Sequence, residues 1–350
     1  MVRSFLRLRG IWGNDLNDNH YRIDLSINYL TIYKKLKFAY TALYFHAKEY
    51  AMSKPTIHVA IAILLHQDKV LVGWREAKQH QGNKHEFPGG KVEEGETPLA
   101  ACRREIYEEV GVGLQDWHTF DVIRHEYDDV IVNLHLFHAI VPTALLNEIQ
   151  QPWAWYSRDE LLSLNFPKAN QAMIQRLYWA HQIKISDQLD GLTQLHQDQL
   201  MYWRVEGTQA QLVELAALSV EQLSQLIINI DIYTKLNTIQ QQMVSAIHLK
   251  QSQLMSLKHG DLSIGKRYIA ACHDLAAMQQ AQRIGCDAIV LSPVLVTATH
   301  PETPALGWQQ FKALASQVDI PVFALGGMQA SDLGLAQEQG AYAIAGIRFL

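Results

Sequence analysis

The sequence predicts two domains of mixed α/β and α+β class: an α+β sandwich over residues 52–182, followed by a small (β/α)8 barrel of the TIM type over residues 183–350. Three observations support this prediction. The chain has 350 residues, which is enough for two domains with separate hydrophobic cores. Before about residue 183, strand-like and helical segments do not alternate strictly. After it, short apolar strands alternate regularly with helical segments.

Residues 1–51 mix Tyr, Leu, Lys and Asn without a clear period. We expect them to form an extension that is poorly ordered or lies upstream of the true start, because Met52-Ser-Lys-Pro leads directly into a strand-like run. A short helical arm over residues 30–51 is an equally supported alternative.

The composition is that of an ordinary soluble globular protein, since 48% of the residues are hydrophobic and 19% are charged. The net charge of −5 provides no overall attraction to nucleic acids or anionic membranes, so we expect neither as a partner. No apolar run approaches the roughly 20 residues that span a bilayer, and the first residues make a poor signal peptide. Cys102, Cys272 and Cys286 form no Cys-x-x-Cys pair, which argues against a zinc ribbon or a disulfide framework and fits a reducing cytoplasm.

The first domain combines strands with two helices. The strand-like runs are HVAIAILLH (58–66), KVLVGW (69–74) and VIVNLHLFHAIV (130–141). One helix is predicted at 98–110. Thr97 is a good N-cap for it, Pro98 suits its first position, and Gly111 is placed to end it. A second helix is predicted at 168–182.

The second domain is predicted from eight short apolar runs, with helix-like segments between most of them. The runs lie at 183–186, 200–205, 226–232, 245–250, 267–272, 287–293, 321–327 and 342–347. The sequence stops at Leu350, which leaves no room for a helix after the eighth run. We therefore expect a small barrel that lacks its last helix.

Three glutamates on the predicted helix 98–110 point to a metal site. Glu105, Glu108 and Glu109 are spaced i, i+3 and i+4, so they share one face of the helix. Like charges repel one another there, and hard divalent cations such as Mg2+ take oxygen ligands of this kind. Arg104 can pair with a neighbouring glutamate and fix its rotamer. An acidic surface helix is the alternative interpretation of the three glutamates alone.

The residues around these glutamates favour the metal site. They follow G-x5-E-x7-R-E-hydrophobic-x-E-E-x-G-hydrophobic, filled by Gly90, Glu96, Arg104, Glu105, Ile106, Glu108, Glu109, Gly111 and Val112. This pattern resembles the Nudix box without a departure. The resemblance implies a Nudix α/β/α fold and hydrolysis of a nucleoside diphosphate linked to another moiety. It also implies Mg2+, or Mn2+ in its place, which neutralises phosphate oxygens and activates a water.

Residues 57–180 resemble the MutT subgroup of Nudix hydrolases, which sanitises oxidised guanine nucleotides. The likeness is carried by WREAKQHQGNKHEFPGGK (74–91) and FPKANQAMIQRL (166–177). It implies hydrolysis of 8-oxo-dGTP to 8-oxo-dGMP and diphosphate, an activity that protects DNA replication from mutation. The resemblance assigns the catalytic roles to Arg104, Glu105, Glu108 and Glu109. It assigns nucleotide contacts to Arg75, His80, Glu86, Phe87, Pro88, Gly89 and Lys91, and further metal ligands to the Gly89 carbonyl and Glu148.

The same resemblance assigns base recognition to Asn170. A side-chain amide offers both an acceptor and donors, and the oxidised base presents an N7–H donor beside the O6 acceptor. Guanine would present two acceptors and leave a buried amide oxygen unpaired, at a cost of roughly 1–3 kcal/mol. Alternatively, Asn170 caps the helix that follows it. Phe87 likewise either faces the base or belongs to the core, and His80 is either a ligand or a surface loop residue.

Residues 267–347 resemble the thiamine-phosphate synthase/TenI family. The likeness is carried by ACHD (271–274), DAIVLSPVLVTATHPETPALGW (287–308) and PVFALGGMQASD (321–332). It implies phosphate contacts at Thr297, Thr299, Gly326 and Gly327, although the two glycines can also form a plain tight turn.

This second resemblance has four departures at charged positions of the family. They lie at Glu206, Ile230, Gln253 and His300. A synthase without these charges loses its main electrostatic help, so we expect the barrel to lack synthase activity. It would instead bind a thiamine-phosphate-like ligand, regulate the Nudix domain or serve as a scaffold. Hydrolysis of thiamine diphosphate or a damaged analogue is the alternative activity of the whole chain.

Overall fold

The computed structural model describes residues 34, 37, 54–77, 82–297 and 302–349. By its contacts the chain divides into two units, Met1–Pro55 and Thr56–Leu350, and the elements that follow belong to the second. The expectations for residues 1–51 lie outside the described residues, except at Lys34 and Lys37, whose backbone is helical. No described helix combines the length and the apolar character that a membrane crossing requires.

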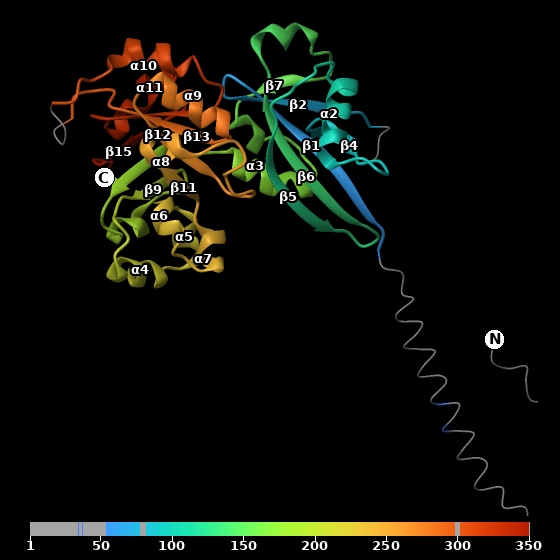
Figure 1. The fold of residues 1–350 in the computed structure, drawn as a ribbon, viewed down its shortest axis with the longest axis horizontal. Coiled ribbons are helices and arrows are strands. Elements are labelled where there is room, and N and C mark those ends of the chain that lie inside the picture. The colour runs from blue at the N-terminus through green and yellow to red at the C-terminus, as the bar shows by residue number, and fades with distance from the viewer. Residues whose placement is uncertain (1–33, 35–36, 38–53, 78–81, 298–301, 350) are drawn as a thin grey trace, which may run out of the picture. The chain divides into compact units, whose positions relative to one another are not determined.

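A seven-stranded sheet begins the second unit (Figure 1). Its main path is β3-β2-β1-β6-β5, while β4 pairs with β1 and β7 pairs with β2. β1 and β6 are parallel, and the other pairs are antiparallel. The strands are β1 (Thr56–His66), β2 (Lys69–Arg75), β3 (Lys84–Glu86), β4 (Gly89–Lys91), β5 (His118–Glu126), β6 (Ile131–Ile140) and β7 (Ala154–Tyr156).

Helix α2 spans Pro98–Glu109, close to its predicted bounds. The Thr97 hydroxyl accepts a hydrogen bond from the Ala100 amide at 3.2 Å, which satisfies one of the free donors at the helix start. Gly111 has a φ of +88°, a left-handed conformation that glycine adopts without steric cost. Both predicted helix ends are confirmed.

Helix α3 spans Gln171–Leu177 and follows a 3-10 turn at Lys168–Asn170, so the prediction of one helix reaching residue 182 is wrong. The chain becomes extended at Tyr178, where ψ is 138°. Trp179 is fully buried and packs edge-on against Phe323 of the barrel, with 5.8 Å between the ring centres. Packing of this tryptophan overrides the helical tendency of the local sequence.

Strand β1 separates two apolar layers, because its alternating side chains face opposite sides of the sheet. Ala62 belongs to the cluster that contains Ile106 of α2. Ile63 belongs to the cluster that contains Met173 of α3. The sheet therefore has a helix on each face, as the expected α/β/α sandwich requires.

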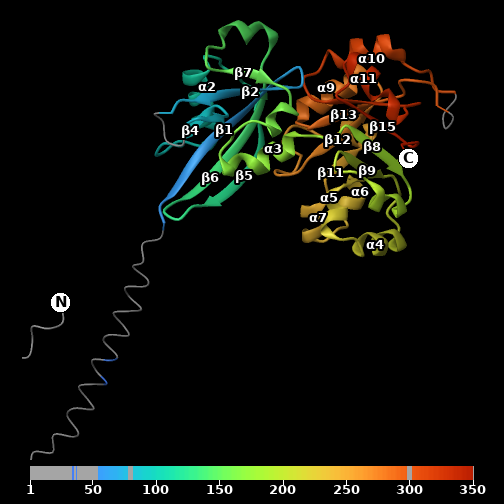
Figure 2. The same cartoon turned by 180° about the vertical axis from the view of Figure 1, so that it is seen from behind.

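Eight parallel strands close into a barrel in the order β10-β11-β12-β13-β14-β15-β8-β9 (Figures 1 and 2). All eight predicted strands are present, but the third ends at Asn229, and residues 230–232 of its predicted range are helical. They are β8 (Gln182–Ser186), β9 (Gln199–Trp203), β10 (Leu226–Asn229), β11 (Ala246–Leu249), β12 (Tyr268–Cys272), β13 (Ala288–Leu291), β14 (Val322–Leu325) and β15 (Ala343–Gly346).

Short helices follow most barrel strands, which is the pattern of a (β/α)8 barrel. The helices are α4 (Gln209–Ala216), α5 (Val220–Ser224), α6 (Ile230–Tyr233), α7 (Thr238–Met243), α8 (Gln251–Ser256), α9 (Leu275–Ile284), α10 (Gly307–Ala315) and α11 (Leu333–Glu338). Further 3-10 turns lie at Thr143–Glu148, Glu160–Leu162, Asp190–Gln194 and Ala330–Asp332.

Hydrogen bonds join the sandwich to the barrel within this unit. Arg176 of α3 donates to the backbone oxygens of Phe120 and Lys266, at 2.7 and 2.6 Å. The hydroxyl of Tyr342 donates to the backbone oxygen of Trp179 at 2.7 Å. Helix α3 and the segment that follows it are therefore anchored by barrel residues.

Candidate active site

Arg104 organises the carboxylates of α2. Its guanidinium donates to both oxygens of Glu96, at 3.1 and 3.0 Å, in a bidentate pair. It also donates to Glu105 at 2.7 Å and to Glu108 at 3.4 Å. The side chain of Glu105 is 15% exposed, whereas that of Glu108 is 57% exposed. The expected pairing of Arg104 is present, and it extends to three of the four glutamates of the motif.

Strand β4 brings glycine backbone against these carboxylates. The Glu109 carboxylate accepts a hydrogen bond from the Gly89 amide at 3.0 Å. A Cβ atom at Gly90 would overlap the Glu105 carboxylate, so only glycine leaves that carboxylate in place. Gly89 has a φ of +146°, which side chains rarely permit. Both positions thus require glycine, Gly89 because of its backbone conformation and Gly90 because the Glu105 carboxylate lies against it.

Glu109 lies in an unusual electrostatic position. The residue is exposed on the helix, but its carboxylate is turned toward β4. Loss of solvent there raises the pKa of Glu109 to about 7, and the negative charges of Glu105 and Glu86 add to the effect. The Gly89 amide and the Arg75 guanidinium oppose this shift without cancelling it. A carboxyl group crowded by others in this way favours the binding of a cation.

The donors of this site fit a hard divalent cation. Carboxylate oxygens of Glu105, Glu108 and Glu109, with the backbone oxygen of Gly89, are the ligand type that Mg2+ and Mn2+ prefer. Over residues 54–77, 82–297 and 302–349, no three acidic, histidine or cysteine side chains lie close enough together to hold a metal as they are placed. Arg104 holds Glu105 and Glu108 in this arrangement, so a cation would have to compete with its guanidinium.

Arg75 and Glu86 form an ion pair across β2 and β3, with 2.6 Å between Nε and the carboxylate oxygen. Both charges act on Glu109, which places the pair near the carboxylates of α2. The backbone oxygen of Lys91 accepts a hydrogen bond from Arg104 at 3.1 Å, and its side chain is exposed. Arg75, in its pair with Glu86, and the exposed side chain of Lys91 thus place positive charge near the motif.

The structure gives less information about three other residues that the sequence assigned to the site. His80 lies outside the described residues. Pro88 is buried, and its backbone oxygen accepts a hydrogen bond from Ala62 at 2.9 Å, which is a structural role within the sheet. Glu148 is exposed in a 3-10 turn, and its backbone oxygen lies beside Gly111 at the end of α2.

Asn170 directly precedes α3, and it does not cap that helix, because its side chain makes no capping hydrogen bond. The capping alternative is therefore wrong. Asn170 is only 7% exposed, and its side-chain amide has no hydrogen-bond partner among the described residues. The amide atoms are not among the side-chain atoms that are closed to solvent without a partner, so the amide remains accessible to a ligand.

A stacked pair of aromatic rings, Phe87 and Phe166, lies near the start of the FPKAN stretch and was not predicted. Phe87 is 5% exposed and belongs to the apolar core, which favours the core alternative for it. Its ring stacks on Phe166, with 4.9 Å between centres and 15° between planes. Asn165 fixes the loop that carries Phe166, because its backbone oxygen accepts from the His85 amide at 2.7 Å. Phe166 belongs to the stretch FPKAN (166–170), but its stacking partner Phe87 is distant in the sequence and is known only from the folded structure.

The barrel residues singled out from the sequence meet at the carboxyl ends of the strands. Thr297, Gly326 and Gly327 line a cavity of about 860 Å3, while Thr299 lies outside the described residues. Gly326 and Gly327 have φ values of +107° and +72°, and a Cβ on either would collide with the preceding strand-end loop. The two glycines therefore form a tight turn and line the cavity at once.

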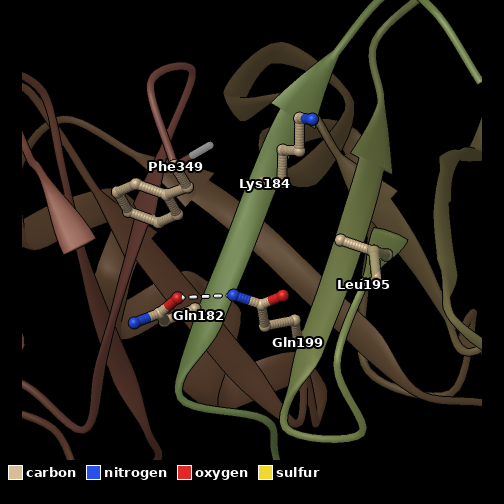
Figure 3. A pocket seen from close by; sticks show the side chains of 5 residues that line it. All are labelled: Gln182, Lys184, Leu195, Gln199 and Phe349. Carbon is tan, nitrogen blue, oxygen red and sulfur yellow. Dashed lines mark hydrogen bonds between the residues drawn. The ribbon is translucent and has the colours of Figure 1, made fainter. Parts of the chain in front are cut away.

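A second depression lies between β8 and β9, with Phe349 beside it (Figure 3). Its walls include Gln182 and Gln199, and the amide of Gln199 donates to the side-chain oxygen of Gln182 at 2.8 Å. These side chains fill the depression themselves, so it offers no room for a ligand.

Comparison with known families separates the chain into two parts. Residues 59–176 match the family described as NUDIX domain, and residues 196–350 match the family described as thiamine monophosphate synthase. The two matches cover the sandwich and most of the barrel.

Individual related proteins likewise match only one part of the chain each. An 8-oxo-dGTP diphosphatase of Escherichia coli (strain K12) is 32% identical over 130 residues, which are 35% of this chain and 95% of that protein. An 8-oxo-dGTP diphosphatase of Haemophilus influenzae is 31% identical over 135 residues, which are 36% of this chain and 94% of that protein. A putative thiamine-phosphate synthase 2 of Aquifex aeolicus is 39% identical over 77 residues, which are 22% of this chain and under half, 41%, of that protein.

Proposed function

The chain belongs to the Nudix hydrolase family, fused to a thiamine-phosphate synthase-like barrel, and on this premise we propose that it hydrolyses 8-oxo-dGTP to 8-oxo-dGMP and diphosphate with Mg2+ or Mn2+. The observation that carries the choice of substrate is Asn170, a residue only 7% exposed whose side-chain amide bonds no other described residue. Such an activity would remove an oxidised precursor before DNA replication uses it. We place the protein in the cytoplasm, where its three buried cysteines stay reduced.

The carboxylates of α2 support the hydrolytic part of the proposal. Glu105, Glu108 and Glu109, with the Gly89 backbone oxygen, would hold the divalent cation. When bound, that cation supplies neutralisation of phosphate oxygens and a more acidic attacking water. Arg104 acts as a positioning residue, because it holds Glu105 and Glu108 on the face of the helix that meets β4. The side chain of Glu108 is 57% exposed, so it is suited to orient or deprotonate the water.

Cationic side chains near the motif support binding of the triphosphate. Arg75 is held by Glu86, so its guanidinium keeps a fixed direction in the site. The exposed ammonium of Lys91 lies on the strand next to α2 and can follow the phosphates. These two charges offset the repulsion between the triphosphate and the glutamates.

Asn170 supports discrimination of the base. Its amide can accept from the N7–H of the oxidised base and donate to O6. Guanine lacks the N7–H, so the amide oxygen would stay unpaired against the bound base, at roughly 1–3 kcal/mol. This corresponds to a preference of about 5- to 150-fold for the oxidised nucleotide.

A substrate panel on the purified full-length protein tests this proposal. We expect kcat/KM to be highest for 8-oxo-dGTP, lower for dGTP by about 5- to 150-fold, and lowest for thiamine diphosphate. The products should be 8-oxo-dGMP and diphosphate. A faster reaction with thiamine diphosphate would overturn the proposal and favour the alternative below.

The alternative substrate is thiamine diphosphate or a damaged analogue of it. The observation in its favour is the barrel, which matches thiamine monophosphate synthase over residues 196–350 and carries a cavity at its mouth. In that case the barrel would bind the thiamine side of the substrate or product. The unpaired amide of Asn170 favours the oxidised purine over this alternative.

A further inference from the structure

Three histidine rings lie against one another where the sandwich meets the barrel. His118 of β5 and His138 of β6 are partners across the antiparallel pair, with 4.8 Å between ring centres and 28° between planes. His259 belongs to the barrel loop 257–267, between α8 and β12, and its ring centre lies 4.5 Å from that of His118. None of these three residues belongs to the site described above.

The three rings lead from the solvent into the junction. His259 is exposed, His118 is half-buried, and His138 is only 9% exposed. The Nε2 atom of His259 donates a hydrogen bond to the backbone oxygen of Trp117 at 3.2 Å. Gly285 ends α9, and a Cβ atom there would collide with the His118 ring, so this ring is also packed against a barrel helix. A charge on a ring packed in this way would lose much of its hydration.

Two arginines present positive charge to His138. Arg176 of α3 places its guanidinium carbon 3.6 Å from the centre of the Phe120 ring, and that ring meets His138 edge-on, with 6.0 Å between centres. The guanidinium of Arg158 also acts on His138 through its charge. Both arginines already have acidic partners, so a proton on His138 would add a further positive charge beside them. These partners are Asp68 for Arg158, and Asp121 and Asp287 for Arg176.

Burial keeps the two inner rings neutral near pH 7. It lowers the pKa of His118 to about 4, and the neighbouring His259 adds to this effect. Asp116 and the partial negative charge at the C-terminal end of α9 oppose the shift. Burial also holds the pKa of His138 well below its usual value, with further contributions from His118 and the two arginines. Rings released to solvent would return toward the ordinary histidine pKa of about 6.5.

The barrel loop 257–267 is fastened to β5 and α3 by hydrogen bonds. The amide of Gly265 donates to the backbone oxygen of Phe120 at 3.0 Å. Arg176 donates to the backbone oxygen of Lys266 at 2.6 Å. Strand β5 is the last strand on its side of the main sheet path, so this loop covers a strand edge that the sheet leaves unpaired. The histidine rings lie beside these bonds, so charges on the rings would act on the same contact.

We propose that His118, His138 and His259 form a proton-sensitive latch, which keeps the barrel loop 257–267 docked on β5 while the rings are neutral and releases it when they take up protons. A released ring binds a proton below about pH 6.5, whereas docked His118 does so only near pH 4. Docking is therefore fully stable above about pH 6.5 and weakens as the pH falls from there toward 4. The latch does not depend on the substrate of the Nudix domain, so it is tested separately from the proposed function.

Hydrogen–deuterium exchange of the Gly265 amide in the full-length protein tests this inference between pH 7.5 and pH 5, after correction for the intrinsic exchange rate at each pH. We expect its protection to fall about tenfold or more between pH 6.5 and pH 5 for each ring that is protonated on release. The amide of Ala62, which donates to the Pro88 backbone oxygen inside the sandwich, should keep its protection. His118→Phe retains a ring that cannot be protonated, so it should make the fall at Gly265 about tenfold smaller.

Control variants separate the latch from other titrating groups. His196→Gln replaces an exposed barrel histidine outside the cluster, and it should leave the fall in protection at its full size. His259 is itself exposed, so His259→Gln keeps the proposal testable if His118→Phe does not fold, and it should also make the fall smaller. The proposal is overturned if the Gly265 amide is equally protected at pH 7.5 and pH 5, or if both cluster variants lose as much protection as the unaltered protein. It is also overturned if Ala62 loses protection together with Gly265, because the whole fold would then open rather than the loop.

Discussion

Asn170 is the residue on which the choice of nucleotide depends. It is 7% exposed, and its side chain neither caps α3 nor bonds any other described residue. Asn170→Ala should therefore reduce the preference for 8-oxo-dGTP over dGTP by about 5- to 150-fold, which corresponds to 1–3 kcal/mol. Stability should change little, because no hydrogen bond of the folded protein is lost. Steady-state kinetics with both nucleotides and a thermal melt provide the measurement.

Asn147→Ala is the matched control, since Asn147 is an exposed asparagine whose side chain bonds no other described residue. It should leave both rates and the melting temperature unchanged. Equal losses for 8-oxo-dGTP and dGTP in Asn170→Ala would show that the residue does not read the base.

The raised pKa of Glu109 predicts how the affinity for the cation depends on pH. Its pKa is raised to about 7 in the cation-free protein, so it carries a proton below that pH. A cation must displace this proton, and its affinity should fall by up to about tenfold for each pH unit below 7. Above pH 8 the affinity should level off. Calorimetric titration with Mn2+ between pH 6 and pH 8.5 measures this dependence.

Glu109→Gln removes the titrating group and provides the comparison. Its affinity for Mn2+ should be weaker at pH 8 and nearly independent of pH below 7. An unaltered protein whose Mn2+ affinity is constant over this range would show that Glu109 does not contact the cation.

At the scale of elements, the packing of α2 against β4 decides where the carboxylates lie. A Cβ atom at Gly90 would overlap the Glu105 carboxylate. Gly90→Ala should therefore displace Glu105 and reduce kcat by about 100-fold, as expected for a small misplacement of a catalytic group. Folding should persist, because the displaced carboxylate is at the end of a flexible side chain. Gly113→Ala is the control, since a Cβ there meets no neighbouring atom.

Activity and a circular dichroism melt should be measured together for both variants. Full activity in Gly90→Ala would mean that Glu105 functions from a different position than the structure gives it.

Elements with strong local signals were predicted from the sequence. The helix at 98–110 was found because Thr97 and Gly111 mark its two ends, and both residues act there as expected. The barrel strands were found because parallel strands are buried on both sides and read as continuous apolar runs. Strand β5 was missed because HTFDVIRHE alternates with charged residues and reads as a loop. Strands β3 and β4 have three residues each, too few for a periodic pattern.

The sequence predicted only those parts of the site whose residues follow a recognisable spacing along the chain. Three glutamates on one helical turn and the arginine before them could be recognised directly. The close approach of Gly90 to Glu105 could not, because it joins β4 to α2 through space. The same holds for the stacking of Phe166 on Phe87 and for the missing cap at Asn170, which depend on where a distant loop packs.

At the scale of the whole molecule, Arg176 connects α3, the helix that follows Asn170, to the barrel. Its side chain is 13% exposed, donates to the Lys266 backbone oxygen and lies 3.6 Å from an oxygen of Asp287. It also covers the Phe120 ring, with 3.6 Å between the guanidinium carbon and the ring centre. Arg176→Met should lower the free energy of unfolding by about 2–4 kcal/mol, because buried acceptors lose their donor.

Arg124→Met is the matched control for this prediction. Arg124 pairs with Glu126 at 3.0 Å, but its side chain is 57% exposed, and such pairs contribute less than about 1 kcal/mol. Denaturant unfolding of the two variants should therefore differ clearly. A midpoint for Arg176→Met equal to that of the unaltered protein would mean that the barrel does not support α3.

The two parts of the chain thus offer different chemistry. The sandwich carries crowded carboxylates that favour a divalent cation, whereas the cavity at the mouth of the barrel is lined by Arg204, Lys250 and Arg348.

The central claim is that the carboxylates of α2 bind a divalent cation that hydrolysis requires. The most direct measurement is the rate of 8-oxo-dGTP hydrolysis as a function of Mn2+ for the unaltered protein, for Glu108→Gln and for the exposed control Glu94→Gln. We predict no turnover in EDTA, a saturable rise with Mn2+ for the unaltered protein and the control, and a loss of about 1,000-fold in Glu108→Gln. Turnover that persists in EDTA, or a Glu108→Gln variant as fast as the control, would contradict this account.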